Sequence, residues 1–179
     1  MSLAYKFRRA ERILKKMDPG DKDRLLHICR QIQDAQAALL AAAGQQMQRC
    51  LSHCEGICCR NIEIDPIISH WDLVFVISLA PQIRSQIRDS LIMEDPLYRT
   101  DCVFLENGRG PCMFPENMRP EVCVVSFCQN DRPLRREIRQ VKRRFFQLTW
   151  FVRWRKARAH LHTLTRAVAA ARSRFDNTA

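Results

Sequence analysis

Nine cysteines in a chain of 179 residues constrain this sequence more than any other feature. Eight of them form two groups of four, which are Cys50, Cys54, Cys58 and Cys59, followed by Cys102, Cys112, Cys123 and Cys128. The odd total and the adjacent pair at 58–59 fit poorly with a complete disulfide framework. Thiolates are soft ligands that favour zinc or iron–sulfur clusters, and both commonly take four sulfurs. The eight cysteines are therefore predicted to be metal ligands, with the two groups folding together around one or two centres.

Other residues near the cysteines are weaker candidates. Cys29 neighbours an apolar helical stripe and has no cysteine close in sequence, so we interpret it as a small core residue. His53 adjoins Cys54 and could ligate the metal or hydrogen-bond a thiolate. The remaining histidines have no metal-ligand context and are expected at the surface or in packing: His27, His70, His160 and His162. Three arginines flank the cysteines and could either offset thiolate charge or be solvated: Arg60, Arg109 and Arg119.

The ordered motifs around the cysteines resemble a known family. They are Cys58-Cys59, Cys102-Val103-Phe104-Leu105, Gly110-Pro111-Cys112 followed by Phe114, Arg119-Pro120 leading to Cys123, and Phe127-Cys128. This series is similar to the YkgJ-family cysteine cluster proteins, the zinc- or iron-chelating CxxCxxCC domain family. The resemblance covers Cys50 to Cys128 and implies a metal site of zinc or iron, with a structural or site role for Arg119.

The first cysteine group departs from the commonest form of that family. It is spaced CxxxCxxxCC and is followed by Ile62-Glu63-Ile64-Asp65. This arrangement looks more like the cysteine region of flagellin lysine N-methylases, which are longer chains. The wider spacing leaves the ligand geometry open.

Caps, prolines and apolar spacing predict a mostly α fold. Helices are expected from Ser2 to Met17, from Asp21 to about Cys50, from the Asp65-Pro66 cap to about Ser78, from Gln82 to Met93, and in a short segment that Pro120 opens and that carries Cys123 and Cys128. Asp18-Pro19-Gly20 is predicted as a stop and turn, and 107–111 as a loop or hairpin turn. We expect one small helical domain in which 1–49 form N-terminal helices, 50–130 a loop-rich cysteine-cluster region and 131–179 a long basic C-terminal helix.

The C-terminal helix combines strong charge with two apolar stripes. Between Arg132 and Arg174 the chain has twelve Arg and two Lys against one acid, Glu137, whereas the whole chain has a net charge of +11. One stripe is Leu134, Ile138, Val141, Phe145, Leu148 and Val152, and the other is Phe146, Trp150, Trp154, Ala157, Leu161, Leu164, Val168 and Ala171. The helix is predicted either to be covered on two sides, by its own domain and by another helix or protomer, or to bend near Thr149.

The partners of this helix follow from the same pattern. A nucleic-acid contact, an interfacial membrane helix and a packing helix all suit basic and aromatic residues. We favour packing, including a homo-oligomer or protein partner, because the stripes are regular and no known nucleic-acid-binding motif accompanies the charge.

The sequence predicts a metal-binding protein that coordinates zinc or iron, including iron–sulfur clusters as one form. The alternative is an enzyme or accessory factor in protein modification, similar to lysine methylation, that uses the metal centre. Catalysis stays open because GxGxxG, P-loop, HExxH and GxSxG motifs are missing and the chain has only five glycines. No apolar run approaches a membrane span, and the N-terminus lacks the apolar core of a signal peptide, so the cytoplasm is the expected location.

Overall fold

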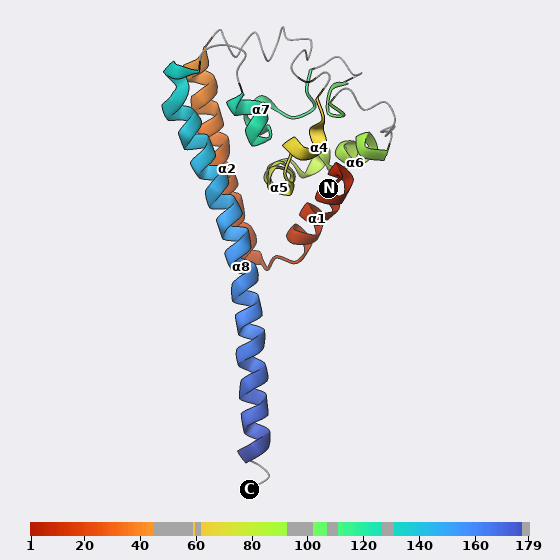
Figure 1. Ribbon diagram of the computed structural model, residues 1–179, viewed down its shortest axis with the longest axis vertical. Helices are drawn as coiled ribbons and strands as arrows, with labels where there is room; N and C mark the ends of the chain where they lie inside the picture. The colour runs from red at the N-terminus through yellow and green to blue at the C-terminus, as the bar shows by residue number, and fades with distance from the viewer. Residues whose placement is uncertain (45–58, 60–61, 93–101, 107–110, 127–130, 177–179) are drawn as a thin grey trace.

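A computed structural model describes residues 1–44, 59, 62–92, 102–106, 111–126 and 131–176. Helices make up most of these residues, which confirms the predicted mostly α class (Figure 1). The described segments contain no strand, only an isolated antiparallel bridge between Leu105 and Cys112. The long C-terminal helix is confirmed as well.

The first two helices begin at side-chain caps. Helix α1 (Leu3–Lys15) begins after Ser2, whose side chain accepts a hydrogen bond from the Tyr5 amide, as predicted. Helix α2 (Pro19–Ala43) begins two residues earlier than predicted. Asp18 is its cap and accepts from the Asp21 amide at 2.8 Å, and Pro19 occupies the first turn, where its missing N–H costs no hydrogen bond. The Asp18-Pro19-Gly20 segment is therefore a helix start as well as a turn.

The predicted helix from Asp65 to Ser78 is two helices. A single turn, α4 (Ile64–Ile67), precedes α5 (His70–Leu79). Asp65 does not cap the second helix, because its carboxylate accepts a hydrogen bond from the Leu3 amide at 2.7 Å. The cap of α5 is Ser69, which forms a reciprocal capping box with Asp72.

Helix α5 is the centre of the core. Leu73 to Ile77 are buried without interruption, so every side of this helix segment is covered. Helix α1 packs on α5, while α2 packs along α8 (Arg135–Asp176) and also contacts α5. The remaining elements complete the body: η3 (Pro81–Ile83), α6 (Arg84–Ile92), η5 (Glu116–Met118), α7 (Glu121–Val125) and η6 (Arg132–Leu134).

Helix α8 runs through Thr149 without interruption and extends well beyond the rest of the molecule (Figure 1). Its first apolar stripe is buried from Leu134 to Val152, as expected for a face that packs on its own domain. Arg155 fastens the helix at the point where it leaves the body, since its Nη1 donates to the Lys16 carbonyl at 3.1 Å and lies 3.5 Å from Asp21 Oδ2. No described helix is long and apolar enough to cross a membrane.

Candidate metal centre

Four of the eight predicted ligands lie within the described residues, and they come from both cysteine groups. Cys59 belongs to the first group, and Cys102, Cys112 and Cys123 belong to the second. The others lie outside the described residues, together with three flanking candidates: Cys50, Cys54, Cys58, Cys128, His53, Arg60 and Arg109.

Backbone hydrogen bonds bring three of the described cysteines together. The Cys102 amide donates to the Cys59 carbonyl at 2.8 Å, which joins the two groups across 43 positions of sequence. Cys112 is then brought back toward Cys102 by paired backbone on either side of 107–110, where the Glu106 amide donates to the Pro111 carbonyl and the Met113 amide to the Phe104 carbonyl, both at 2.9 Å. Residues 107–110 of the predicted loop or hairpin turn lie outside the described residues. Phe104 and Phe114 pack beneath the paired backbone with ring centroids 4.6 Å apart.

Cys123 joins this group from α7. Its thiol pKa is raised, first by the protein packed around it and then by the neighbouring groups Cys112, Cys102, Asp72 and Cys59. Such interactions fall off with distance, so the four thiols share one region of the molecule. Cys123 is nevertheless exposed at its surface, whereas Cys59, Cys102 and Cys112 are half-buried.

The pKa of the Cys112 thiol is raised, and the groups around it act in both directions. Burial raises the pKa of the Cys112 thiol, while the Phe114 amide and the Arg119 guanidinium lower it and Glu106 raises it. The Nε atom of Arg119 is buried and has no hydrogen-bond partner. Arg119 therefore lies close enough to Cys112 for its charge to act on that thiol.

Two buried polar side chains hold the backbone that leads to Cys123, and sequence reasoning missed both. Gln36 of α2 donates from Nε2 to the Arg119 carbonyl at 2.8 Å and accepts at Oε1 from the Arg119 amide at 3.1 Å. Asp72 of α5 accepts from the Glu121 amide at 2.8 Å. These two are the buried polar residues of the described part of the chain, and both bind the same three-residue segment from opposite helices. Buried polar groups need partners, so this segment is fixed on both sides of Pro120.

Burial also acts on Asp72 itself. It raises the pKa of the carboxyl group, and hydrogen bonds from Ser69 and Glu121 oppose that rise. Oδ2 accepts from the Ser69 amide at 2.8 Å and from Ser69 Oγ at 2.6 Å, while Oδ1 accepts from the Glu121 amide. One carboxylate therefore caps α5 and positions the start of α7.

The residues interpreted as non-ligands behave as predicted where they are described. Cys29 is completely buried in the core, and burial raises its thiol pKa to about 12. His27 is exposed and its Nε2 pairs with Gln31 at 2.9 Å. His70 lies against the Trp71 ring with centroids 3.8 Å apart. The side chains of His160 and His162 lie outside the described part.

The described side chains alone do not complete a metal site. Within the described ranges, no group of three or more His, Cys, Asp or Glu residues is arranged so that it could hold a metal ion. A hollow of about 880 Å³ lies between α1, α2 and α5 and has no cysteine in its lining.

Comparison with known proteins adds no relative. No family model matches the chain, and neither the curated proteins nor the solved structures contain a significant match.

Proposed function

We propose that this protein binds zinc or iron through its two groups of cysteines, either as mononuclear thiolate sites or as iron–sulfur clusters. The observation that supports the proposal is the convergence of Cys59, Cys102, Cys112 and Cys123 from both groups. Cysteines that served only as small core residues would be dispersed and apolar in their surroundings, as Cys29 is.

The cysteine thiols are suitable ligands for zinc or iron. Thiols with raised pKa values hold their protons near neutral pH and make a poor nucleophile, but a metal ion displaces those protons directly. Burial raises the Cys123 pKa most, and repulsion from the neighbouring groups raises it further, so a cation bound among these thiolates would remove that repulsion. Arg119 would supply part of the same compensation at Cys112.

The decisive experiment is purification under anaerobic, metal-controlled conditions, followed by elemental analysis and thiol titration. We expect zinc or iron in the wild-type protein and in Cys29→Ala, which removes a thiol away from the cluster. Cys112→Ala and Cys123→Ala should lose metal. Folded protein that lacks both metals under either growth regime, and in which the eight clustered thiols all titrate, would overturn the proposal.

Visible absorption separates the two metals. Zinc is colourless, whereas thiolate-bound iron and iron–sulfur clusters absorb through sulfur-to-iron charge transfer. A brown protein whose colour bleaches with an iron chelator would identify iron, and a colourless protein with stoichiometric zinc would identify the structural alternative.

The exposed surface of Cys123 supports the second candidate, an enzyme or accessory factor in protein modification. A centre that can be reached from outside could hold three protein ligands and one exchangeable position, as catalytic metal sites do. X-ray absorption spectroscopy of the loaded protein measures this directly. Four sulfurs on every metal would rule out the open position, while three sulfurs and one oxygen would justify assays of methyl transfer to lysine-rich acceptors.

A further inference from the structure

The side of α8 that faces away from the body exposes a ladder of aromatic rings. Phe146, Trp150 and Trp154 have exposed fractions of 67%, 60% and 54%. Their rings stack in order, with centroids 6.5 Å apart for the first pair and 6.2 Å for the second, the latter at an interplanar angle of 5°. We call these three residues the aromatic ladder. Large apolar side chains exposed together on one helix face indicate an interaction surface.

The sequence continues the ladder at the spacing of a helix-pairing seam. From Trp150 onward the apolar positions alternate steps of four and three, through Trp154, Ala157, Leu161, Leu164, Val168 and Ala171. The backbone of this whole segment is described as helix. Residues 156–176 extend by about 30 Å beyond Arg155, which still contacts the body. An isolated helix is marginal in water, and a strict alternation of four and three is the pattern that packs against another helix.

The charges along α8 indicate which kind of partner helix fits against this seam. No acidic residue occurs between Glu137 and Asp176. The positions that flank the seam in a heptad register include Arg153, Arg158, Arg172 and Arg174. In a paired helix such positions face their counterparts on the partner, so two copies of this helix would bring arginines together in either orientation. A partner helix with Glu or Asp at these positions would be attracted instead.

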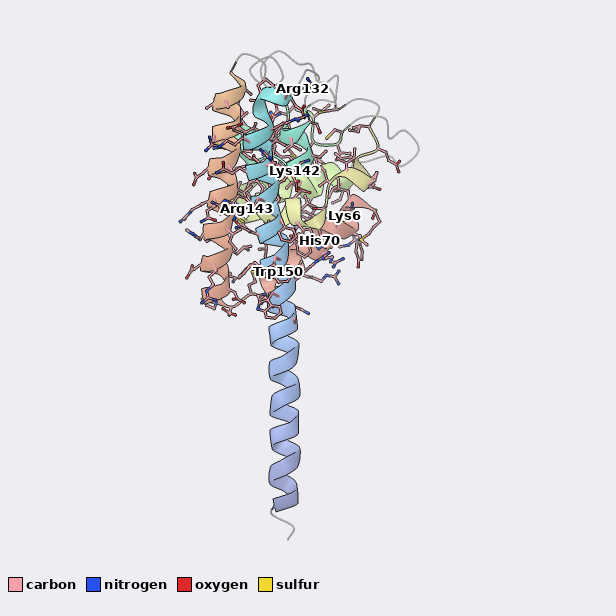
Figure 2. The ribbon with its side chains drawn as sticks, turned by 60° about the vertical axis from the view of Figure 1, so that its left-hand side comes forward. Lys6, His70, Arg132, Lys142, Arg143 and Trp150 are labelled. Carbon is pink, nitrogen blue, oxygen red and sulfur yellow. The ribbon has the colours of Figure 1, made fainter. Side chains whose placement is uncertain are left out.

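The same face also presents arginines to an anionic partner beside the body. Arg139 and Arg143 precede Phe146 by seven and three residues and so share its face of the helix. They help to line a shallow hollow of about 340 Å³ together with Arg136, Gln140 and Arg144. Figure 2 shows Lys142, Arg143 and Trp150 following one another along α8 toward the projecting end, with Arg132 of η6 before them. Guanidinium groups bind carboxylates through paired hydrogen bonds.

From these observations we infer that the aromatic ladder and its continuation dock an acidic amphipathic helix of a protein partner. Tryptophan and arginine are the residues that dominate binding energy at protein interfaces. Nucleic acid fits less well, because proteins stack bases on aromatic rings within a basic groove, whereas this ladder lies on the convex side of a helix. The inference is independent of the metal centre.

The test uses the full chain as purified and synthetic helical peptides. The probe peptide has Leu at the seam positions and Glu at the flanking positions. One control peptide has Lys at the flanking positions, and a second keeps Glu but has Ser in the seam. Calorimetry and the fluorescence of Trp150 and Trp154 both report binding. We expect the Leu/Glu peptide to bind at least about tenfold more tightly than either control.

Variants separate docking from general charge attraction. The double substitution Trp150→Ala with Trp154→Ala should weaken Leu/Glu peptide binding by about tenfold or more and leave every arginine in place. Ile92→Ala removes an equally exposed apolar side chain from α6 and should change nothing. Circular dichroism verifies that both variants stay folded.

Three results would overturn the inference. The first is equal binding of the Glu/Ser peptide, which would mean charge attraction alone. The second is self-association of the wild-type chain in sedimentation that the double substitution abolishes. The third is tighter binding to single-stranded RNA or to phosphatidylserine vesicles than to the Leu/Glu peptide, lost with the same substitution.

Discussion

Gln36 uses both ends of its amide on one peptide unit, as donor to the Arg119 carbonyl and acceptor from the Arg119 amide. Gln36→Leu would keep the apolar contacts of the side chain but leave both backbone groups without these partners. We expect a loss of about 1–3 kcal/mol in the free energy of unfolding, measured by denaturant titration. We also expect weaker metal retention, because the segment leading to Cys123 loses its anchor.

The matched control for this substitution lies on the same helix. Gln33 is half-buried, and Gln33→Leu should change stability by no more than about 0.5 kcal/mol. Equal effects of the two substitutions would mean that the pairing with Arg119 contributes nothing specific.

Asp72 serves three donors with two carboxylate oxygens, so its isosteric amide cannot replace it. In Asp72→Asn one end of the side chain becomes an NH₂ group, which would face either the Ser69 donors or the Glu121 amide. We expect a loss of about 1–3 kcal/mol in thermal or denaturant unfolding. Ser69→Ala removes only the cap hydroxyl and should cost about 1 kcal/mol. An Asn variant as stable as the wild type would contradict the assigned geometry.

The buried thiol of Cys29 makes stability depend on pH in the alkaline range. Its pKa rises from 9.0 to about 12 on folding, so above pH 9 the unfolded chain releases a proton that the folded chain keeps. The stabilisation is complete below about pH 9 and is lost as the pH approaches 12. Between about pH 8 and pH 11 the wild type should lose about 2–3 kcal/mol more unfolding free energy than Cys29→Ala. Parallel losses in the two proteins would refute this account.

At the scale of elements, α8 has a buried and an exposed face, and truncation of a side chain should destabilise the protein only on the buried face. Leu148 is completely buried, so Leu148→Ala should cost about 2–5 kcal/mol of unfolding free energy. Trp150 is two positions away but 60% exposed, so Trp150→Ala should stay within about 0.5 kcal/mol. Denaturant unfolding of both variants measures the difference. A large cost at Trp150 in the isolated protein would mean that the aromatic ladder already packs within the chain.

The same contrast shows which elements could be predicted from sequence. Local signals placed α1 through its Ser2 cap and α8 through its apolar stripe. Errors occurred where two local signals competed. Proline at 19 resembled a stop but occupies the first turn of α2, and Asp65-Pro66 resembled a cap although Asp65 binds the Leu3 amide across 62 positions.

The residues of the candidate site also divide into those that could be predicted from the sequence and those that could not. Counting cysteines identified the ligand candidates and separated Cys29 from them, because grouping is visible along the chain. Gln36 and Asp72 could not be found in this manner, since their partners lie 83 and 49 positions away. On a helix each of them resembles an ordinary polar residue, and only the packing of α2 and α5 around Arg119 to Glu121 gives them their positioning role.

For the whole molecule, the described contacts predict that metal binding stabilises the cysteine segments more than the helical core. The α2–α8 and α1–α5 pairs bury most of the apolar core, whereas Cys102 and Cys112 are only partly buried and pack against it. The segments around Cys102, Cys112 and Cys123 instead have short elements, few turns of helix and an isolated bridge. Because thiolate sites rarely exist in an unfolded chain, the free energy of metal binding should stabilise these segments most.

Hydrogen exchange of the loaded and the chelator-treated protein measures this coupling. We expect amides within 102–106 and 111–126 to exchange faster after metal removal, while the core amides of α2, α5 and the body-facing half of α8 keep their protection. Cys29→Ala should show the same difference, and Cys123→Ala should exchange like the metal-free protein whether or not metal is added. Uniform acceleration across α2 and α8 would mean that the metal holds the entire fold, and no change at 102–126 would separate the cysteines from any metal site.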